Sequence, residues 1–306
     1  MATTAGQVLL VYLEEQISEL RRHAPGVRAR RPAEIHHMRV ASRRLRSLLA
    51  SGRPLFDDGA VDPVRAELRW LSEMLGAARD PGVVHDRLAS LLAREPESLR
   101  FGPAAERIDE ELNALAAAGF EAAIEALEGE RFTDLLAALD KLFAGAPLSP
   151  KAAGAAGSTI RQLMAGDERR LRRTVAALPL PADDGGAARD AGLHEVRKAA
   201  KRLRYSAEFA EYAVLFPRGS GAGQTAGGKQ HRRAKKTAAM AAKIQQLLGR
   251  HQDSVMARAR LAELGGRALR SGENGFSYGR LHAREESLAA DAERAFLKLW
   301  RKLPSS

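Results

Sequence analysis

One helical segment occurs twice in this chain, and this repetition limits the fold more than any other feature. Residues 35–46 read IHHMRVASRRLR and residues 193–204 read LHEVRKAAKRLR, with six of the twelve positions identical and no gap. A second block, LSEMLGAARD at 71–80, resembles IQQLLGRHQD at 244–253 and follows in the same order. Two matched blocks in the same order indicate an internal duplication, so the sequence predicts two copies of one structural unit.

The composition predicts an all-α fold. Ala, Leu, Arg and Glu, which are strong helix formers, are abundant. No segment alternates apolar and polar residues as a half-buried strand does. Together with the duplication, this predicts two copies of one helical unit. The first half should span about 4–144, a linker about 145–158 and the second half about 159–303.

Proline and glycine suggest where individual helices end. Asp80-Pro81 resembles a helix start, so we expect one helix to end near Ala77 and another to begin at this dipeptide. Separate helices are also expected over 234–248 and 251–269. The sequence further predicts a turn-rich break at 180–186 and a flexible, basic, Gly-rich loop at 217–233, to which we assign no role.

The net charge of the chain is +11, which favours a polyanionic partner. The cations gather in the two repeated helices and in Lys229–Lys236. Residues 101–145, by contrast, carry ten acids and three bases, which is typical of a solvated outer face. The chain has no cysteine, which excludes disulfides and thiolate metal sites. Without a recognisable signal peptide or long apolar segment, we expect a soluble, cytoplasmic protein with no membrane contact.

Each repeated segment places a histidine and three cations on one face of a helical wheel, opposite its apolar residues. Like charges at this spacing repel, and a bound chain of anions would relieve the repulsion. Arginine presents a planar fork of donors to phosphate, and a nearby polyanion should raise the pKa of histidine. The residues predicted to bind a polyanion are His36, Arg39, Arg43, Arg46, His194, Arg197, Lys201 and Arg204.

Other residues near these faces could contact the anion or could equally be ordinary surface. We regard them as secondary candidates. They are Arg44, Arg65, Arg69, Lys198, Arg202, Tyr205, Lys236 and Lys243.

The repeated blocks EIHHMRVASRRLR and LHEVRKAAKRLRY, each followed by L-G-x-x-x-D, resemble the two halves of the CHAD (conserved histidine α-helical) domain. The resemblance covers about residues 5–302. It implies two pseudo-symmetric helical bundles with a basic groove or cavity between them, binding of long-chain inorganic polyphosphate and, in bacteria, association with polyphosphate granules. It also implies that the eight primary residues line the polyphosphate path.

Some CHAD domains are fused to a CYTH domain, which carries an E-x-E-x-K signature. Here Glu128-Gly-Glu130 is followed by Arg131 and Phe132, so the signature is absent. We therefore expect a stand-alone CHAD protein without a CYTH domain.

Three alternative functions remain open. Nucleic acid could bind weakly and nonspecifically at low salt, although Tyr205 is the only aromatic residue near the cations. A phosphohydrolase or phosphotransferase would need His36, His194, Asp80 and Asp253 to converge, and no Walker loop is present. A helical adaptor could recruit protein partners, which the sequence leaves unknown. We expect a non-enzymatic protein without catalytic residues, metal or cofactor.

Overall fold

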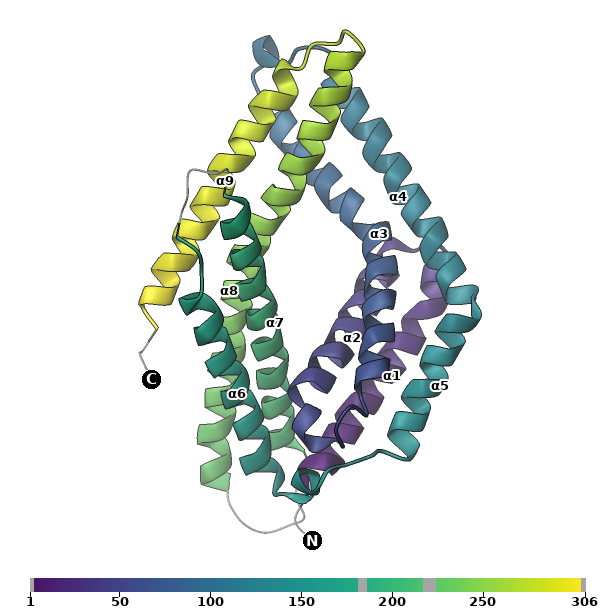
Figure 1. The fold of residues 1–306 in the computed structure, drawn as a ribbon, viewed down its shortest axis with the longest axis vertical. Coiled ribbons are helices and arrows are strands. Elements are labelled where there is room, and N and C mark those ends of the chain that lie inside the picture. The colour runs from purple at the N-terminus through teal and green to yellow at the C-terminus, as the bar shows by residue number, and fades with distance from the viewer. Residues whose placement is uncertain (1–2, 181–185, 217–223, 304–306) are drawn as a thin grey trace.

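The computed structural model describes residues 3–180, 186–216 and 224–303, and Figure 1 shows that helices dominate them. The helices are α1 (Ala5–Arg28), α2 (Pro32–Ser51), α3 (Asp62–Ala93), α4 (Ala104–Glu128), α5 (Glu130–Ala144), α6 (Ala156–Ala176), α7 (Ala187–Leu215), α8 (Gln224–Arg270) and α9 (Phe276–Arg301), with short 3₁₀ turns at η1 (Arg53–Leu55), η2 (Glu97–Leu99) and η3 (Pro150–Ala153). Within these described ranges, β pairing is limited to isolated bridges. The prediction of an all-α fold is confirmed.

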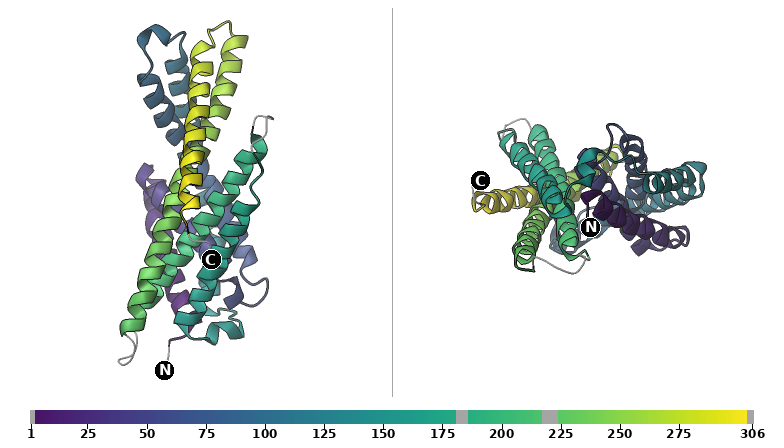
Figure 2. Two further views of the ribbon diagram at one scale, coloured as in Figure 1. Left: turned by 90° about the vertical axis from the view of Figure 1, so that its left-hand side faces the viewer. Right: turned by 90° about the horizontal axis from the view of Figure 1, so that it is seen from below.

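The helices form two groups that meet at two levels (Figure 1). Helix α2 of the first group packs against α7 of the second. At the upper end, the tips of the α3–α4 and α8–α9 hairpins come together, and Figure 2 shows both hairpins rising to the same end. The origin of the two groups by duplication, a groove between them and the half boundaries stay predictions from the sequence.

Local signals explain where the first helices begin. The Thr4 hydroxyl accepts a hydrogen bond from the Gln7 backbone N–H at 3.3 Å, and the Gln7 side chain accepts one from the Thr4 N–H at 2.9 Å. This capping box satisfies donors that an isolated helix start leaves free. Helix α2 begins with Pro32, which needs no hydrogen-bonded N–H there, and carries Glu34 in its first turn.

The expected break before Pro81 is wrong, because α3 continues through it to Ala93. Pro81 cannot donate a hydrogen bond to the Ala77 carbonyl. At that level, however, a Cβ on Gly119 would lie 2.2 Å from the Ala77 carbonyl oxygen, so α4 approaches the α3 backbone very closely. Packing along the two helices offsets the missing hydrogen bond.

Two predictions for the second half also need correction. Helix α8 is continuous from Gln224 to Arg270, so there is no break near Gly249. The basic stretch expected as a loop is helical from 224 to 233, while residues 217–223 lie outside the described residues. Most of the expected turn at 180–186 also lies outside them.

The main apolar core is continuous across the two groups of helices. Tyr12 of α1 stacks on Phe209 of α7, with ring centroids 5.3 Å apart. A second, apical core joins the ends of α3 and α4 to those of α8 and α9, through residues such as Leu88, Leu112 and Leu261. The two halves are therefore held together by apolar burial at two separate levels.

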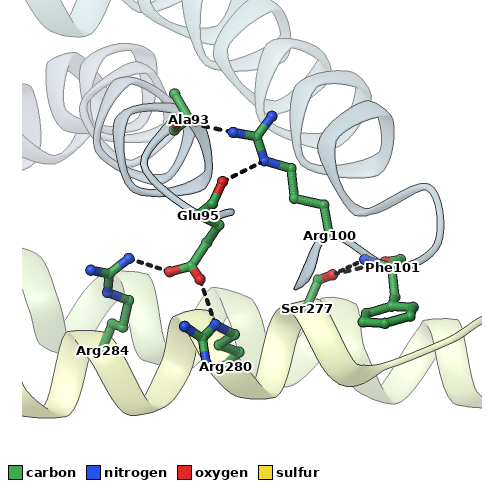
Figure 3. Close-up of polar contacts among 7 residues, drawn as sticks. All are labelled: Ala93, Glu95, Arg100, Phe101, Ser277, Arg280 and Arg284. Carbon is green, nitrogen blue, oxygen red and sulfur yellow. Dashed lines mark hydrogen bonds and ion pairs between the residues drawn. The ribbon is translucent and has the colours of Figure 1, made fainter. Parts of the chain in front are cut away.

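Polar contacts reinforce the apical junction (Figure 3). The Glu95 carboxylate, only 3% exposed, accepts hydrogen bonds from Arg280 and Arg284 of α9. Nearby, Arg87 of α3 donates two hydrogen bonds of 2.6 Å to the fully buried Glu285 of α9. We call these five residues the apical clamp. Its ion pairs join the two halves, and each of its two buried carboxylates has at least one arginine partner.

Candidate functional site

Five cations from the repeated helices gather where α2 meets α7, and four of them lie within electrostatic range of the fifth, Lys201. We call them the central cationic cluster, and they are Arg39, Arg43 and Arg46 of α2 with Arg197 and Lys201 of α7. Burial, together with the other four charges, lowers the pKa of Lys201 to about 6. The structure thus brings together five of the eight primary residues predicted from the sequence.

The central cationic cluster has far fewer acids than cations. Arg39 forms a two-pronged ion pair with Asp80, one bond of which measures 3.1 Å. Arg43, Arg46, Arg197 and Lys201 make no hydrogen bond or ion pair with any described residue. The Nε atoms of Arg43 and Arg197 are buried without a partner. Unpaired buried charges are costly, so this arrangement favours an external anion.

In each half, the glycine of the second repeated block lies beside an arginine of the first block. A Cβ on Gly76 would lie 3.6 Å from Nη2 of Arg39, and a Cβ on Gly249 would lie 3.7 Å from Nε of Arg197. Larger side chains at these glycines would crowd the guanidinium groups. Burial raises the pKa of Asp253 above its usual value, and the nearby charge of Arg197 opposes that rise. The Leu-Gly-x-x-x-Asp block therefore positions the cations of the first block.

The two repeated histidines lie beside the cluster, and each has a pKa below its ordinary value. Partial burial is the main reason that the pKa of His36 lies below its ordinary value, with Arg79 as the next contribution. Burial likewise lowers the pKa of His194, whose Nδ1 lies 2.7 Å from the Gln252 side-chain oxygen. The raised pKa expected from the sequence therefore requires the anion to be bound.

Three predicted arginines are already paired with other parts of the fold. Arg204 contacts Glu208 at 2.9 Å, and Arg44 contacts the same carboxylate group at 3.4 Å. Arg202 contacts Asp167 of α6 at 2.6 Å and donates to the Ala50 carbonyl of α2 at 2.6 Å. These contacts connect helices, and the role of the three arginines in anion binding stays a prediction.

Six secondary candidates remain, and most of them already contact another side chain. Tyr205 is 2% exposed and has the guanidinium groups of Arg44 and Arg204 over its ring, at 5.8 and 4.9 Å. Each of four others has a polar partner: Arg65 with Asp62, Arg69 with Glu73, Lys198 with Glu195 and Lys243 with Gln246. Lys236 is exposed on α8.

Sequence reasoning missed Arg79, whose charge reaches both His36 and Arg43. A signal was present, because Arg79 precedes Asp80 in the first copy of the second block. The equivalent residue of the second copy is Gln252, which contacts His194. Each copy thus places one polar residue of the second block beside the histidine of the first.

Sequence reasoning also missed the cations on α6. A cavity of about 1040 Å³ is lined by Arg169, Arg170 and Arg173 of α6, and by Arg65 and Arg202 from the predicted set. We call it the basal cavity. The charges of Arg65 and Arg170 both act on Arg202, which places them near one another. The run D-E-R-R-L-R-R at 167–173 was the available signal.

A second cavity, of about 710 Å³, lies between α3, α4 and α8. Arg39 and Asp80 border it, while Leu112, Leu115 and Met256 give it an apolar side. This cavity thus borders the central cationic cluster at one of its arginines. Among the described residues, no helix is long and apolar enough to cross a membrane.

Known proteins are similar in sequence to almost the whole chain. Two uncharacterized proteins from strains of Mycobacterium tuberculosis are each 33% identical over 293 residues, which is 95% of this chain and 52% of the relative. The chain therefore spans about half the length of these curated relatives.

Solved structures are similar to it as well. PptA from Streptomyces chartreusis superposes with a TM-score of 0.77 at 25% identity, covering 98% of this chain and 100% of PptA. The CHAD domain from the plant Ricinus communis gives a TM-score of 0.73 at 25% identity, covering 99% and 93% of the two chains. Residues 11–262 match the CHAD domain family itself. With its doubled histidine and cation helices and this fold, the chain belongs to the CHAD domain family.

Proposed function

We propose that the chain binds long-chain inorganic polyphosphate through the central cationic cluster, without catalysing its turnover. The observation that carries this proposal is the set of four cations, contributed by both repeated helices, that have no partner among the described residues. Polyphosphate carries about one negative charge per phosphate and has no bases. A row of arginine forks and a lysine matches that repeating charge.

Two further observations support a simple polyanion over nucleic acid. Tyr205 is buried beneath two guanidinium groups, so its ring is not open to stack on a base. The cations also come from two helices that pack against each other, so a flexible chain of phosphates can contact both repeated helices. Association with polyphosphate granules in the cell follows from this proposal and from the family resemblance.

The proposal is tested by calorimetric titration at near-physiological salt. Long-chain polyphosphate, single-stranded RNA, duplex DNA and pyrophosphate are compared at equal phosphate concentration. We expect polyphosphate to bind most tightly, with an affinity that falls steeply as salt increases because counterions are released on binding. Equal or tighter binding of RNA or DNA would overturn the proposal.

The non-catalytic part needs its own measurement. Polyphosphate is incubated with the protein and Mg²⁺, and released phosphate is measured over time. We expect no release above the rate without protein. Steady, protein-dependent release would show instead that the chain is a phosphohydrolase.

A further inference from the structure

The hairpin between α1 and α2 gathers two histidines and a carboxylate on the side of α2 next to the predicted anion site. His23 of α1 and Glu34 and His37 of α2 each offer a ligand atom, and these atoms lie within 4.8 Å of one another. In the part of the chain that the structure describes, this is the one such group of three. His23 lies outside the repeated segments, and His37 lies in the first copy at a position that Glu195 occupies in the second.

The contacts of His23 match those of a metal-binding histidine. Its Nδ1 lies 2.6 Å from Oε2 of Glu34, and its Nε2 lies 3.2 Å from Oε2 of Glu19. A histidine that binds metal through one nitrogen usually donates its other N–H to a carboxylate, which orients the ring. Glu19 stands in that orienting position, while Glu34 stands on the side where the metal would be.

An ion pair between His23 and Glu34 accounts for only part of this arrangement. The hydrogen bond from His23 holds the pKa of Glu34 below its usual range, as an ion pair would. That ion pair does not explain the position of His37. The ring centroid of His37 lies 4.9 Å from that of His23, and its side chain forms no hydrogen bond with any described residue. A metal ion held by all three side chains accounts for the position of His37 as well as for the contact between His23 and Glu34.

The backbone holds these side chains in place before any ion binds. Arg30 adopts a left-handed conformation with φ of 57° in the tight turn, and its guanidinium contacts Glu121 of α4 at 2.7 Å. Glu34 packs directly over Gly26, where an added Cβ would lie 2.3 Å from the Glu34 Cγ. A metal site is tighter when its ligands are fixed in this way.

We propose that His23, Glu34 and His37 form a binding site for a divalent transition metal such as Zn²⁺, with Glu19 as the residue that orients His23. Two nitrogens and one carboxylate oxygen suit Zn²⁺, whereas Mg²⁺ and Ca²⁺ prefer oxygen ligands alone. With His23 and Glu34 largely shielded and His37 exposed, a fourth position is open to water. Ligand atoms around tetrahedral Zn²⁺ stand roughly 3.4 Å apart, so only small side-chain shifts are needed.

The test is a titration of the tag-free, full-length chain with Zn²⁺, without polyphosphate, in a buffer that does not bind metals. We expect one zinc ion per chain. Glu34→Gln and His37→Asn should each weaken binding by at least about tenfold, and Glu19→Gln by about tenfold, as for other residues that orient a ligand. Co²⁺ bound at the site should give the visible absorption of a low-coordinate centre, which His37→Asn removes.

His85 provides a matched control. Its Nε2 lies 2.8 Å from Asp109 and its Nδ1 lies 3.6 Å from Asp86, so it too has two carboxylates but no second imidazole. His85→Asn should leave zinc affinity unchanged. Absence of zinc binding by the parent chain, or equal affinity in the parent, Glu34→Gln and His37→Asn, would overturn the proposal. Both results can be obtained whether or not polyphosphate binds.

Discussion

The apical clamp and the central cationic cluster both place arginines between the two halves, but they treat charge in opposite ways. In the clamp, Glu95 has two arginine partners and Glu285 has one, and both carboxylates are almost completely buried. In the central cationic cluster, Asp80 pairs with Arg39 and the other four cations have no hydrogen-bonded partner among the described residues.

This difference separates charges that stabilise the fold from charges that remain available to a ligand. A buried ion pair with good hydrogen bonds tolerates burial because each charge offsets the other, and removal of one member exposes the full desolvation cost. Unpaired cations destabilise the ligand-free protein, as the low pKa of Lys201 shows. The same cations gain the most when an anion arrives. The contrast predicts that removing arginines of the clamp lowers stability, whereas removing arginines of the central cationic cluster lowers binding.

The largest effect is expected in the clamp. Arg87→Met leaves the fully buried Glu285 without its partner, which should lower the free energy of unfolding by about 3–5 kcal/mol. Chemical denaturation measures this change. Arg294→Met is the control, because its ion pair with Asp291 is exposed and should contribute less than about 1 kcal/mol. A loss below that value for Arg87→Met would contradict the role given to the clamp.

The next largest effect should appear in the central cationic cluster. Arg43→Gln combined with Arg197→Gln should weaken polyphosphate binding by about a hundredfold or more, since two charged hydrogen-bonding groups are lost. It should not lower stability. Arg280→Gln combined with Arg284→Gln removes the same charge from the clamp and should instead reduce stability with little effect on affinity. If both pairs weaken binding equally, net charge rather than the cluster determines affinity.

Lys201 should make binding depend on pH. Its pKa of about 6 in the free protein should rise beside an anion, so binding takes up a proton near pH 7. Affinity should therefore increase as the pH falls from about 8 towards 6, and level off below the free pKa apart from a contribution by His36 and His194. Calorimetry in buffers with different ionisation enthalpies measures the proton uptake. Lys201→Met should abolish most of it, and unchanged uptake in this variant would contradict the assignment.

The smallest effect is expected for an exposed lysine outside the central cationic cluster. Lys236→Gln should change the free energy of polyphosphate binding by less than about 1 kcal/mol, because its charge is well solvated. The same titration measures it. A loss as large as that of the Arg43/Arg197 pair would extend the binding path along α8.

Much of the fold could be predicted because helical signals are local. The abundance of helix-forming residues and the helical spacing of apolar residues correctly indicated an all-α fold. Pro81 and Gly249 were misleading, since each is a local signal for a break that long-range packing overrides. For Pro81, the close approach of Gly119 on another helix supplies the compensation.

The sequence by itself determined which cations share a helix face, because that depends only on the period of the helix. It correctly grouped Arg39, Arg43 and Arg46, and likewise Arg197 and Lys201. Only the tertiary structure decided which cations meet an acid. Arg202 is paired because Asp167 lies on α6, and Arg43 is unpaired because no acid among the described residues reaches it. Charge pairing depends on residues far apart in the chain, and the period of a single helix carries no information about them.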